Sequence, residues 1–242
     1  MTLLEMWDNC KFQNRFFPLI PMMAQMDFER ARFNMVEQQI RPWEVLDPQV
    51  LDLLFRVRRE DFVPEAYRML AFADLEIPLG YGERMLQPKL EGRMLQALAL
   101  RPEDKVLEVG TGSGYMTALL ASLARHVHSV EIIAEFSASA RKKLQAHGFH
   151  NVAIEVGDAA RGWDKHAPYD AIVLTGSVPV LPAAFQASLN PGGRLIAVVG
   201  EPPVMEARFI TCVAAGAGKS TDLFETCIPP LQNALRLEKF VF

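Results

Sequence analysis

Cysteine is scarce in this chain of 242 residues and occurs only at Cys10, Cys212 and Cys227. An odd and widely spaced set of cysteines argues against a disulfide framework and is typical of a reducing compartment, so we expect a cytoplasmic protein. The histidines are also few, and the sequence contains no His-x-x-x-His pair or similar ligand motif. We therefore expect no metal site.

A long hydrophobic run and a cluster of basic residues are missing as well. No segment reaches the ~20 apolar residues that a membrane-spanning helix requires. The formal net charge is −4, and no block of Lys or Arg stands out. We therefore expect neither a membrane nor a nucleic-acid partner. No surface for self-association can be identified either, so a monomer is the working expectation.

The first 25 residues lack the features of a targeting segment. Their apolar patches are interrupted by Asp8, Lys11 and Arg15. No basic region precedes a clean apolar stretch, which argues against a signal peptide. We expect residues 1–25 to be a poorly ordered extension.

Residues 26–100 show mostly helical patterns. Apolar residues at helical spacing follow Asp27 and Asp47, and aspartate is a favoured N-cap residue. Further helices are expected near Pro64 and over residues 89–100. The stretch from Leu75 to Pro88 is punctuated by Gly and Pro and cannot be one regular element. We predict a helical section with one irregular loop.

The second half of the chain alternates strand and helix patterns. This alternation predicts a parallel sheet covered on both faces. The last segment, residues 207–231, has the pattern of two strands joined by a Gly-rich turn. We predict an α/β fold with a Rossmann-like, mostly parallel seven-stranded sheet and a C-terminal antiparallel hairpin. The five expected strands before the hairpin are residues 105–109, 127–131, 152–156, 169–174 and 194–199, and the helices between them are residues 115–124, 134–148 and 182–189.

A glycine loop, VLEVGTGSGY at residues 106–115, joins the first of these strands to a helix. It lies at the carboxyl end of the strand, where open α/β sheets bind ligands. Glycine lets a ligand approach the main chain, and the helix N-terminus offers free N–H groups. The spacing is G-x-G-x-G, whereas the dinucleotide fingerprint is G-x-G-x-x-G. On its own the loop is weak evidence, because glycines also serve tight turns.

Three acidic residues at strand ends favour one ligand. Glu131 ends the second strand, where its carboxylate can accept both hydroxyls of a ribose, and Asp158 follows the third strand, where it can flank an adenine. Glu108, beside the loop, would repel a pyrophosphate but favour an ammonium and a sulfonium. This combination indicates S-adenosylmethionine, and an NAD-dependent dehydrogenase is the alternative. The predicted cofactor-binding residues are Glu108, Gly110, Thr111, Gly112, Ser113, Gly114, Glu131, Asp158 and Ala159.

The stretch GAGKST, Gly216–Thr221, resembles the end of a phosphate-binding loop. The first glycine of G-x-x-x-x-G-K-[ST] would fall on Val213, and no helix follows. We interpret these residues as a hairpin turn.

Eight stretches of the chain match the motifs of one family. They are MVEQQI (35–40), FVPEAY (62–67), IPLGYG (77–82), QP (87–88), VLEVGTGSGY (106–115), VGD (156–158), PYDAI (168–172) and LNPGGRLIAVVG (189–200). By these stretches the chain resembles the protein-L-isoaspartate O-methyltransferases, a branch of the class I methyltransferases, from about Arg30 to Pro230. The resemblance implies methyl transfer from S-adenosylmethionine to the abnormal carboxylate of isoaspartyl residues, which starts the repair of aged proteins. It also implies isoaspartyl-containing proteins or peptides as partners, a substrate-side section at residues 26–100 and a cofactor-binding domain at residues 101–242.

The substrate loop departs from the family pattern. The family continues GYG with Gln-Thr-Ile-Ser-Gln-Pro, whereas this chain has Glu83-Arg84-Met85-Leu86-Gln87-Pro88. Leu86 replaces the serine whose hydroxyl is thought to hold the substrate carboxylate, so Arg84 and Leu86 are the candidate catalytic positions.

Three interpretations of this loop remain open. Arg84 replaces the lost donor, or the pocket accepts a different, small-molecule acceptor, or Arg84 points to solvent. A non-catalytic cofactor-binding module is a further alternative. A carboxylate is already ionised near neutral pH, so the lack of an obvious His or Lys base does not argue against an enzyme.

Overall fold

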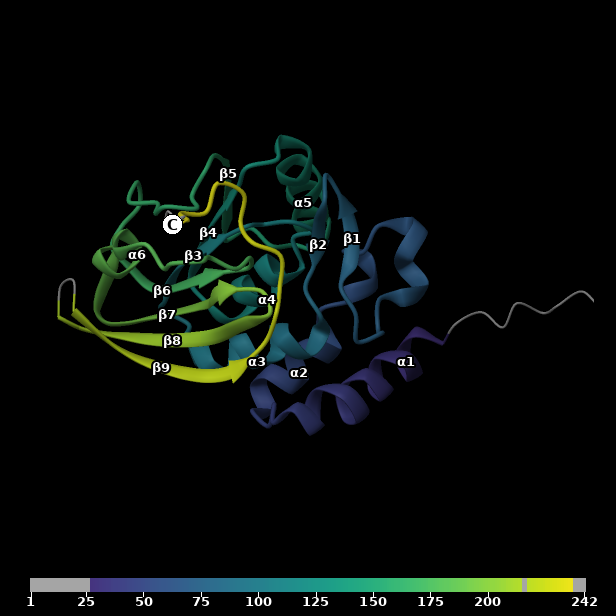
Figure 1. The fold of residues 1–242 in the computed structure, drawn as a ribbon. Helices are drawn as coiled ribbons and strands as arrows, with labels where there is room; N and C mark the ends of the chain where they lie inside the picture. Colours follow the sequence, from purple (N-terminus) through teal and green to yellow (C-terminus); the bar gives the residue numbers. More distant parts are fainter. Residues whose placement is uncertain (1–26, 215–216, 237–242) are drawn as a thin grey trace, which may run out of the picture.

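A computed structural model of the chain describes residues 27–214 and 217–236, so the extension predicted at residues 1–25 lies outside the described residues. Within them, seven strands form one sheet in the order β5-β4-β3-β6-β7-β8-β9 (Figure 1). The strands from β5 to β7 are parallel, and β8 and β9 are antiparallel additions. This arrangement confirms the predicted fold class. The strands are β3 (Lys105–Val109), β4 (His126–Glu131), β5 (Val152–Val156), β6 (Tyr169–Leu174), β7 (Leu189–Glu201), β8 (Val204–Ala214) and β9 (Ala217–Glu225).

The central strands β3 and β6 are buried on both faces. This burial explains why their sequences are nearly continuous apolar runs, as is typical of a parallel sheet. Successive residues of β3 point to opposite sides, and Val106 and Leu107 accordingly belong to two separate cores. The first core packs against α3 (Pro88–Leu98), α4 (Tyr115–Leu123) and α5 (Ala134–Ala146), and the second against α6 (Ala183–Ala187).

The N-terminal section is helical, with both predicted caps in place. Asp27 accepts a hydrogen bond from the Arg30 N–H (3.1 Å) and starts α1 (Phe28–Met35). Asp47 accepts one from the Gln49 N–H (2.8 Å) and starts α2 (Pro48–Arg56). The other helical elements of this section are short. They are the π-helix Val36–Ile40 and the 3₁₀ helices Arg41–Trp43, Arg59–Asp61 and Glu65–Leu70, and the last of these is the helix expected near Pro64.

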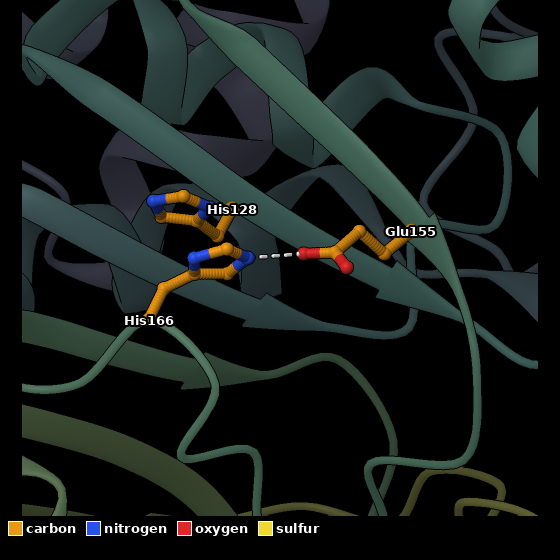
Figure 2. Close-up of side chains that lie close together, drawn as sticks. All are labelled: His128, Glu155 and His166. Carbon is orange, nitrogen blue, oxygen red and sulfur yellow. Dashed lines mark hydrogen bonds and ion pairs between the residues drawn. The ribbon is translucent and has the colours of Figure 1, made fainter.

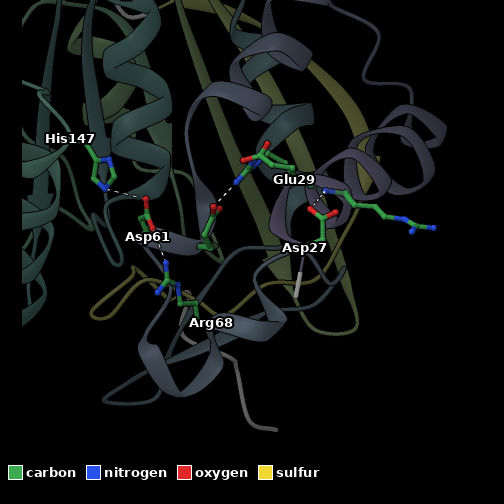
Figure 3. Close-up of polar contacts among 8 residues, drawn as sticks. Asp27, Glu29, Asp61, Arg68 and His147 are labelled. Atoms are coloured by element: carbon green, nitrogen blue, oxygen red, sulfur yellow. Dashed lines mark hydrogen bonds and ion pairs between the residues drawn. The ribbon is translucent and has the colours of Figure 1, made fainter. Parts of the chain in front are cut away.

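Polar contacts tie this helical section to the sheet domain (Figure 3). The Asp61 carboxylate lies 3.3 Å from Arg68 Nη2 and 3.5 Å from Nε2 of His147, the residue that caps α5. Lys143 of α5 donates to the Phe62 carbonyl (2.8 Å). The helical section therefore packs against the C-terminal end of α5 in the sheet domain.

The structure corrects three local expectations. The irregular stretch contains a hairpin of β1 (Ile77–Gly80) and β2 (Glu83–Met85). Strand β7 starts at Leu189, not at residue 194, because residues 190–193 form an irregularity between two registered segments. Strand β9 starts at Ala217, with Ala214 opposite it, so residues 217–221 of GAGKST are strand rather than turn. Close packing favours glycine at position 218, because an added Cβ there would lie 2.8 Å from the Ile210 Cγ2.

No helix among the described residues is both long and apolar enough to cross a membrane.

Candidate active site

The three loop glycines all have positive φ, but they serve different contacts. An added Cβ on Gly110 would lie 2.3 Å from Thr175 Oγ1, and one on Gly114 would lie 3.0 Å from the Ala140 Cβ. These two glycines are required by close packing. Gly112 approaches only the Leu79 side chain and lines an open cleft, so it is the glycine that leaves the backbone accessible.

A cleft of about 670 Å³ opens at the carboxyl ends of the parallel strands. The structure brings together on its wall seven of the predicted residues: Arg84, Leu86, Gly110, Gly112, Glu131, Asp158 and Ala159. Thr111 and Ser113 line an adjoining hollow under Leu86, while Glu108 and Gly114 line neither.

Glu131 is held at the end of β4 by the backbone. Its Oε2 accepts from the Gly112 N–H (2.8 Å) and its Oε1 from the Ile133 N–H (2.9 Å). Burial raises the pKa of this carboxyl, and the backbone hydrogen bonds lower it. A carboxylate has about four acceptor positions, so two remain for a ligand.

Asp158 follows β5 and is oriented from two sides. Its Oδ1 accepts from the Ala160 N–H (3.0 Å), and its Oδ2 accepts from Asn233 Nδ2 (2.9 Å). The side chain therefore joins the cleft wall to a segment far away in the sequence.

That segment, residues 226–234, is called the closing segment here. It runs from β9 back across the sheet toward β4 and β5 (Figure 1) and contributes Pro229 to Gln232 to the cleft. Buried Ser177 holds it: its N–H donates to the Pro229 carbonyl (2.9 Å), its hydroxyl donates to the Ile228 carbonyl (3.0 Å), and its carbonyl accepts from the Leu231 N–H (2.9 Å).

The closing segment also contacts the stretch of residues 83–88. Gln232 Nε2 donates to Glu83 Oε1 (2.8 Å), opposite the Asn233 contact to Asp158. Sequence reasoning missed this part of the site. The available signal was the position of Thr175 and Gly176 at the carboxyl end of β6, where open sheets bind ligands. Both residues line the cleft, and Leu231 packs on Gly176.

Glu108 lies behind the glycine loop rather than on the cleft wall. It is fully buried, and its Oε2 accepts from the hydroxyls of Thr117 and Ser129 (2.5 Å each). Burial raises the pKa of the carboxyl to about 8, although the two hydroxyl hydrogen bonds lower it. Glu108 therefore braces the loop and carries little negative charge at neutral pH.

The folded protein is expected to become less stable as pH rises, and Glu108→Gln should make this decrease in stability smaller. The folded carboxyl has a pKa of about 8 and the unfolded one a value near 4.5, so the folded state retains a proton that the unfolded state releases. Stability should therefore fall as pH rises through this window. Burial raises the pKa of Glu91 only to about 7. The decrease in the free energy of unfolding between pH 7 and 8 is therefore due chiefly to Glu108.

Thermal unfolding at pH 7 and at pH 8.5 measures this effect. The wild type should lose melting temperature between the two conditions, and Glu108→Gln should lose less. Glu103→Gln, at an exposed position, is the matched control and should follow the wild type. Parallel curves for all three proteins would contradict the assignment.

Arg84 and Leu86 meet the cleft in different ways. The Arg84 side chain is 53% exposed, and its Nη1 lies 3.9 Å from Glu76 Oε2, a distance that leaves the guanidinium available. Leu86 is buried, with its side chain on the cleft and its carbonyl accepting from Arg59 Nη2 (2.6 Å). The guanidinium is thus the charged donor of this wall, and Leu86 makes the wall apolar.

Comparisons with known proteins agree with this geometry. Residues 30–219 match the family model described as Protein-L-isoaspartate(D-aspartate) O-methyltransferase. The chain belongs to this family. A protein-L-isoaspartate O-methyltransferase of Synechococcus sp. (strain JA-2-3B'a(2-13)) is 42% identical over 183 residues, which cover 76% of this chain and 75% of the relative. One of Myxococcus xanthus (strain DK1622) is 46% identical over 156 residues, covering 64% and 74%.

A solved structure shares the fold of this chain. It is a protein from Plasmodium falciparum, described as a putative protein-L-isoaspartate O-methyltransferase in complex with S-adenosyl-L-homocysteine. The TM-score is 0.72 at 19% identity, and the match covers 85% of this chain and 98% of that one. The family predicted from the sequence motifs is therefore confirmed.

Proposed function

We propose that this chain transfers a methyl group from S-adenosylmethionine to the side-chain carboxylate of L-isoaspartyl residues in damaged proteins, which starts their repair. The observation that carries the proposal is that Glu131, Asp158 and the loop with Arg84 line one cleft. Family membership supports the same reaction.

The cleft fits the cofactor by its donor set. Glu131 keeps two acceptor positions for ribose hydroxyls, and Asp158 supplies an acceptor for an adenine amine. Ile132 and Phe136 give the apolar surface that an adenine ring needs, and Gly112 leaves the backbone open. When bound, the cofactor supplies a methyl group carried on a sulfonium.

The chain's own contribution is binding, alignment and exclusion of water. The acceptor carboxylate is ionised near neutral pH, so no residue has to remove a proton. Arg84 can hold that carboxylate through a bidentate ion pair. Leu86 and the closing segment cover the reacting atoms with apolar surface, and fixed alignment under such cover accelerates group transfer.

Arg84→Ala is expected to raise KM for an isoaspartyl peptide about tenfold or more, because a hydrogen bond to a charged group contributes about 1.5–3 kcal/mol. Leu86→Ser should lower KM, since the hydroxyl returns a donor to the position. Steady-state methyl transfer to one isoaspartyl peptide measures both, with exposed Arg125→Ala as the control.

The apolar wall favours a second candidate function. Met85 and Leu86 are buried and line the hollow beside the glycine loop, a surface suited to an apolar small-molecule acceptor. If Arg84→Ala leaves KM unchanged and Leu86→Ser leaves the rate at background, the isoaspartyl carboxylate is not bound in this loop and the second candidate replaces the first.

A further inference from the structure

We propose that His128, Glu155 and His166 form a binding site for one first-row divalent transition metal of the zinc class. One ligand atom from each of the three residues lies within 4.8 Å of the other two. Ligands about 2.1 Å from a tetrahedral zinc ion are roughly 3.4 Å apart, so side-chain rotation within this cluster can bring the three ligand atoms to that spacing. This site is separate from methyl transfer and does not depend on the proposed function.

The parallel sheet assembles the cluster from distant positions. His128 of β4 lies opposite Ala153 of β5, and Glu155 is two residues further on, so both side chains share one face of the sheet. His166 comes from the loop before β6, and Lys105 Nζ donates to its carbonyl (2.8 Å). The separation of these residues in the sequence explains why no ligand motif was visible.

The three side chains already face one another (Figure 2). His166 Nε2 lies 2.5 Å from Glu155 Oε1, and the rings of His128 and His166 stack with centroids 4.2 Å apart. His128 Nδ1 is buried and has no hydrogen-bond partner among the described residues. A metal ion would take the place of the proton shared by His166 and Glu155, and it would require one ring to turn out of the stack. His128 and His166 are only half-buried, which leaves room for that turn.

The chemistry of the donor set suits a transition metal. Two imidazoles and one carboxylate select zinc, nickel or copper over magnesium and calcium, which prefer oxygen ligands.

The main competitor for the site is Lys165. Its Nζ pairs with the other oxygen of Glu155, and its charge repels a cation. The ligands join β4, β5 and the loop of residues 157–168, in which Trp163 packs on Gly157. Metal binding would therefore stabilise the loop that also carries Asp158.

The test is a titration of the metal-free full chain with zinc chloride by calorimetry, followed by thermal unfolding with and without zinc. Replacing Cys10 and Cys227 by serine in all samples removes competing thiols. One ion is expected to bind and to raise the melting temperature. His128→Ala and His166→Ala should each lower the affinity at least tenfold, and Lys165→Ala should raise it several-fold.

The control is His150→Ala, which removes an exposed imidazole outside the cluster and should bind zinc as the parent does. Magnesium should give no heat and no shift in melting temperature. The absence of saturable zinc binding would overturn the proposal. Binding that survives both His128→Ala and His166→Ala, in variants with parental circular dichroism, would overturn it equally.

Discussion

Arg59→Ala is expected to lower the free energy of unfolding by about 3–5 kcal/mol, the usual cost of breaking a buried ion pair from one side. Arg59 is 1% exposed, as is its ion-pair partner Glu91. The guanidinium also donates to the carbonyls of Ala71 (2.9 Å) and Leu86 (2.6 Å). Its removal leaves a buried carboxyl and two carbonyls without their partner.

Urea unfolding of the two proteins measures this cost. The matched control is Arg56→Ala, which breaks the ion pair with Asp52 at a position where both side chains are more than half exposed. Such surface pairs contribute about 0.2–1 kcal/mol. Arg59→Met combined with Glu91→Leu should recover part of the loss, because no uncompensated charge remains buried, although the carbonyls of Ala71 and Leu86 stay without their donor. Equal unfolding midpoints for Arg59→Ala and Arg56→Ala would refute the predicted cost.

Glu131→Ala is expected to weaken the binding of S-adenosylhomocysteine by about 1.5–3 kcal/mol, or roughly ten- to a hundredfold, because ribose hydroxyls lose a charged acceptor. The substitution also frees the Gly112 and Ile133 N–H groups that this carboxylate accepts from. The glycine loop then loses its anchor on β4, which adds to the loss of affinity.

Calorimetric titration of S-adenosylhomocysteine into each protein tests this prediction. Glu135→Ala, an exposed position in the first turn of α5, is the control and should bind as the wild type does. NAD should not bind to any of them. Unchanged affinity in Glu131→Ala would remove Glu131 from the cofactor site, and tight NAD binding would favour a dehydrogenase.

Periodic patterns in the sequence allowed most of the fold to be predicted. Strand β3 and helix α4 follow from an apolar run and a glycine loop that allow few alternatives. The hairpin of β1 and β2 could not be predicted, because glycine and proline mark irregular backbone without showing which residues pair. The extended start of β7 was missed for a similar reason: Pro191 and Gly192 normally end a strand, but here they form an irregularity within it.

The candidate site was only partly predictable, because several of its contacts join distant segments. Glu131 and Asp158 could be placed from their positions after strands. The contacts of Asn233 with Asp158 and of Gln232 with Glu83 join residues more than 70 positions apart and leave no local pattern. Glu108 illustrates the opposite error: its position beside the loop suggested a charge facing the ligand, whereas burial against Thr117 and Ser129 makes it a brace.

Methyl transfer to an isoaspartyl peptide, compared with its normal aspartyl twin, tests the central claim most directly. The purified chain and S-adenosylmethionine labelled in the methyl group are incubated with each peptide, and the label in the peptide is counted. We expect label in the isoaspartyl peptide, as a base-labile methyl ester, and only background in the aspartyl one. Equal labelling of both peptides, or no label in either while S-adenosylhomocysteine still binds, would contradict the proposed function.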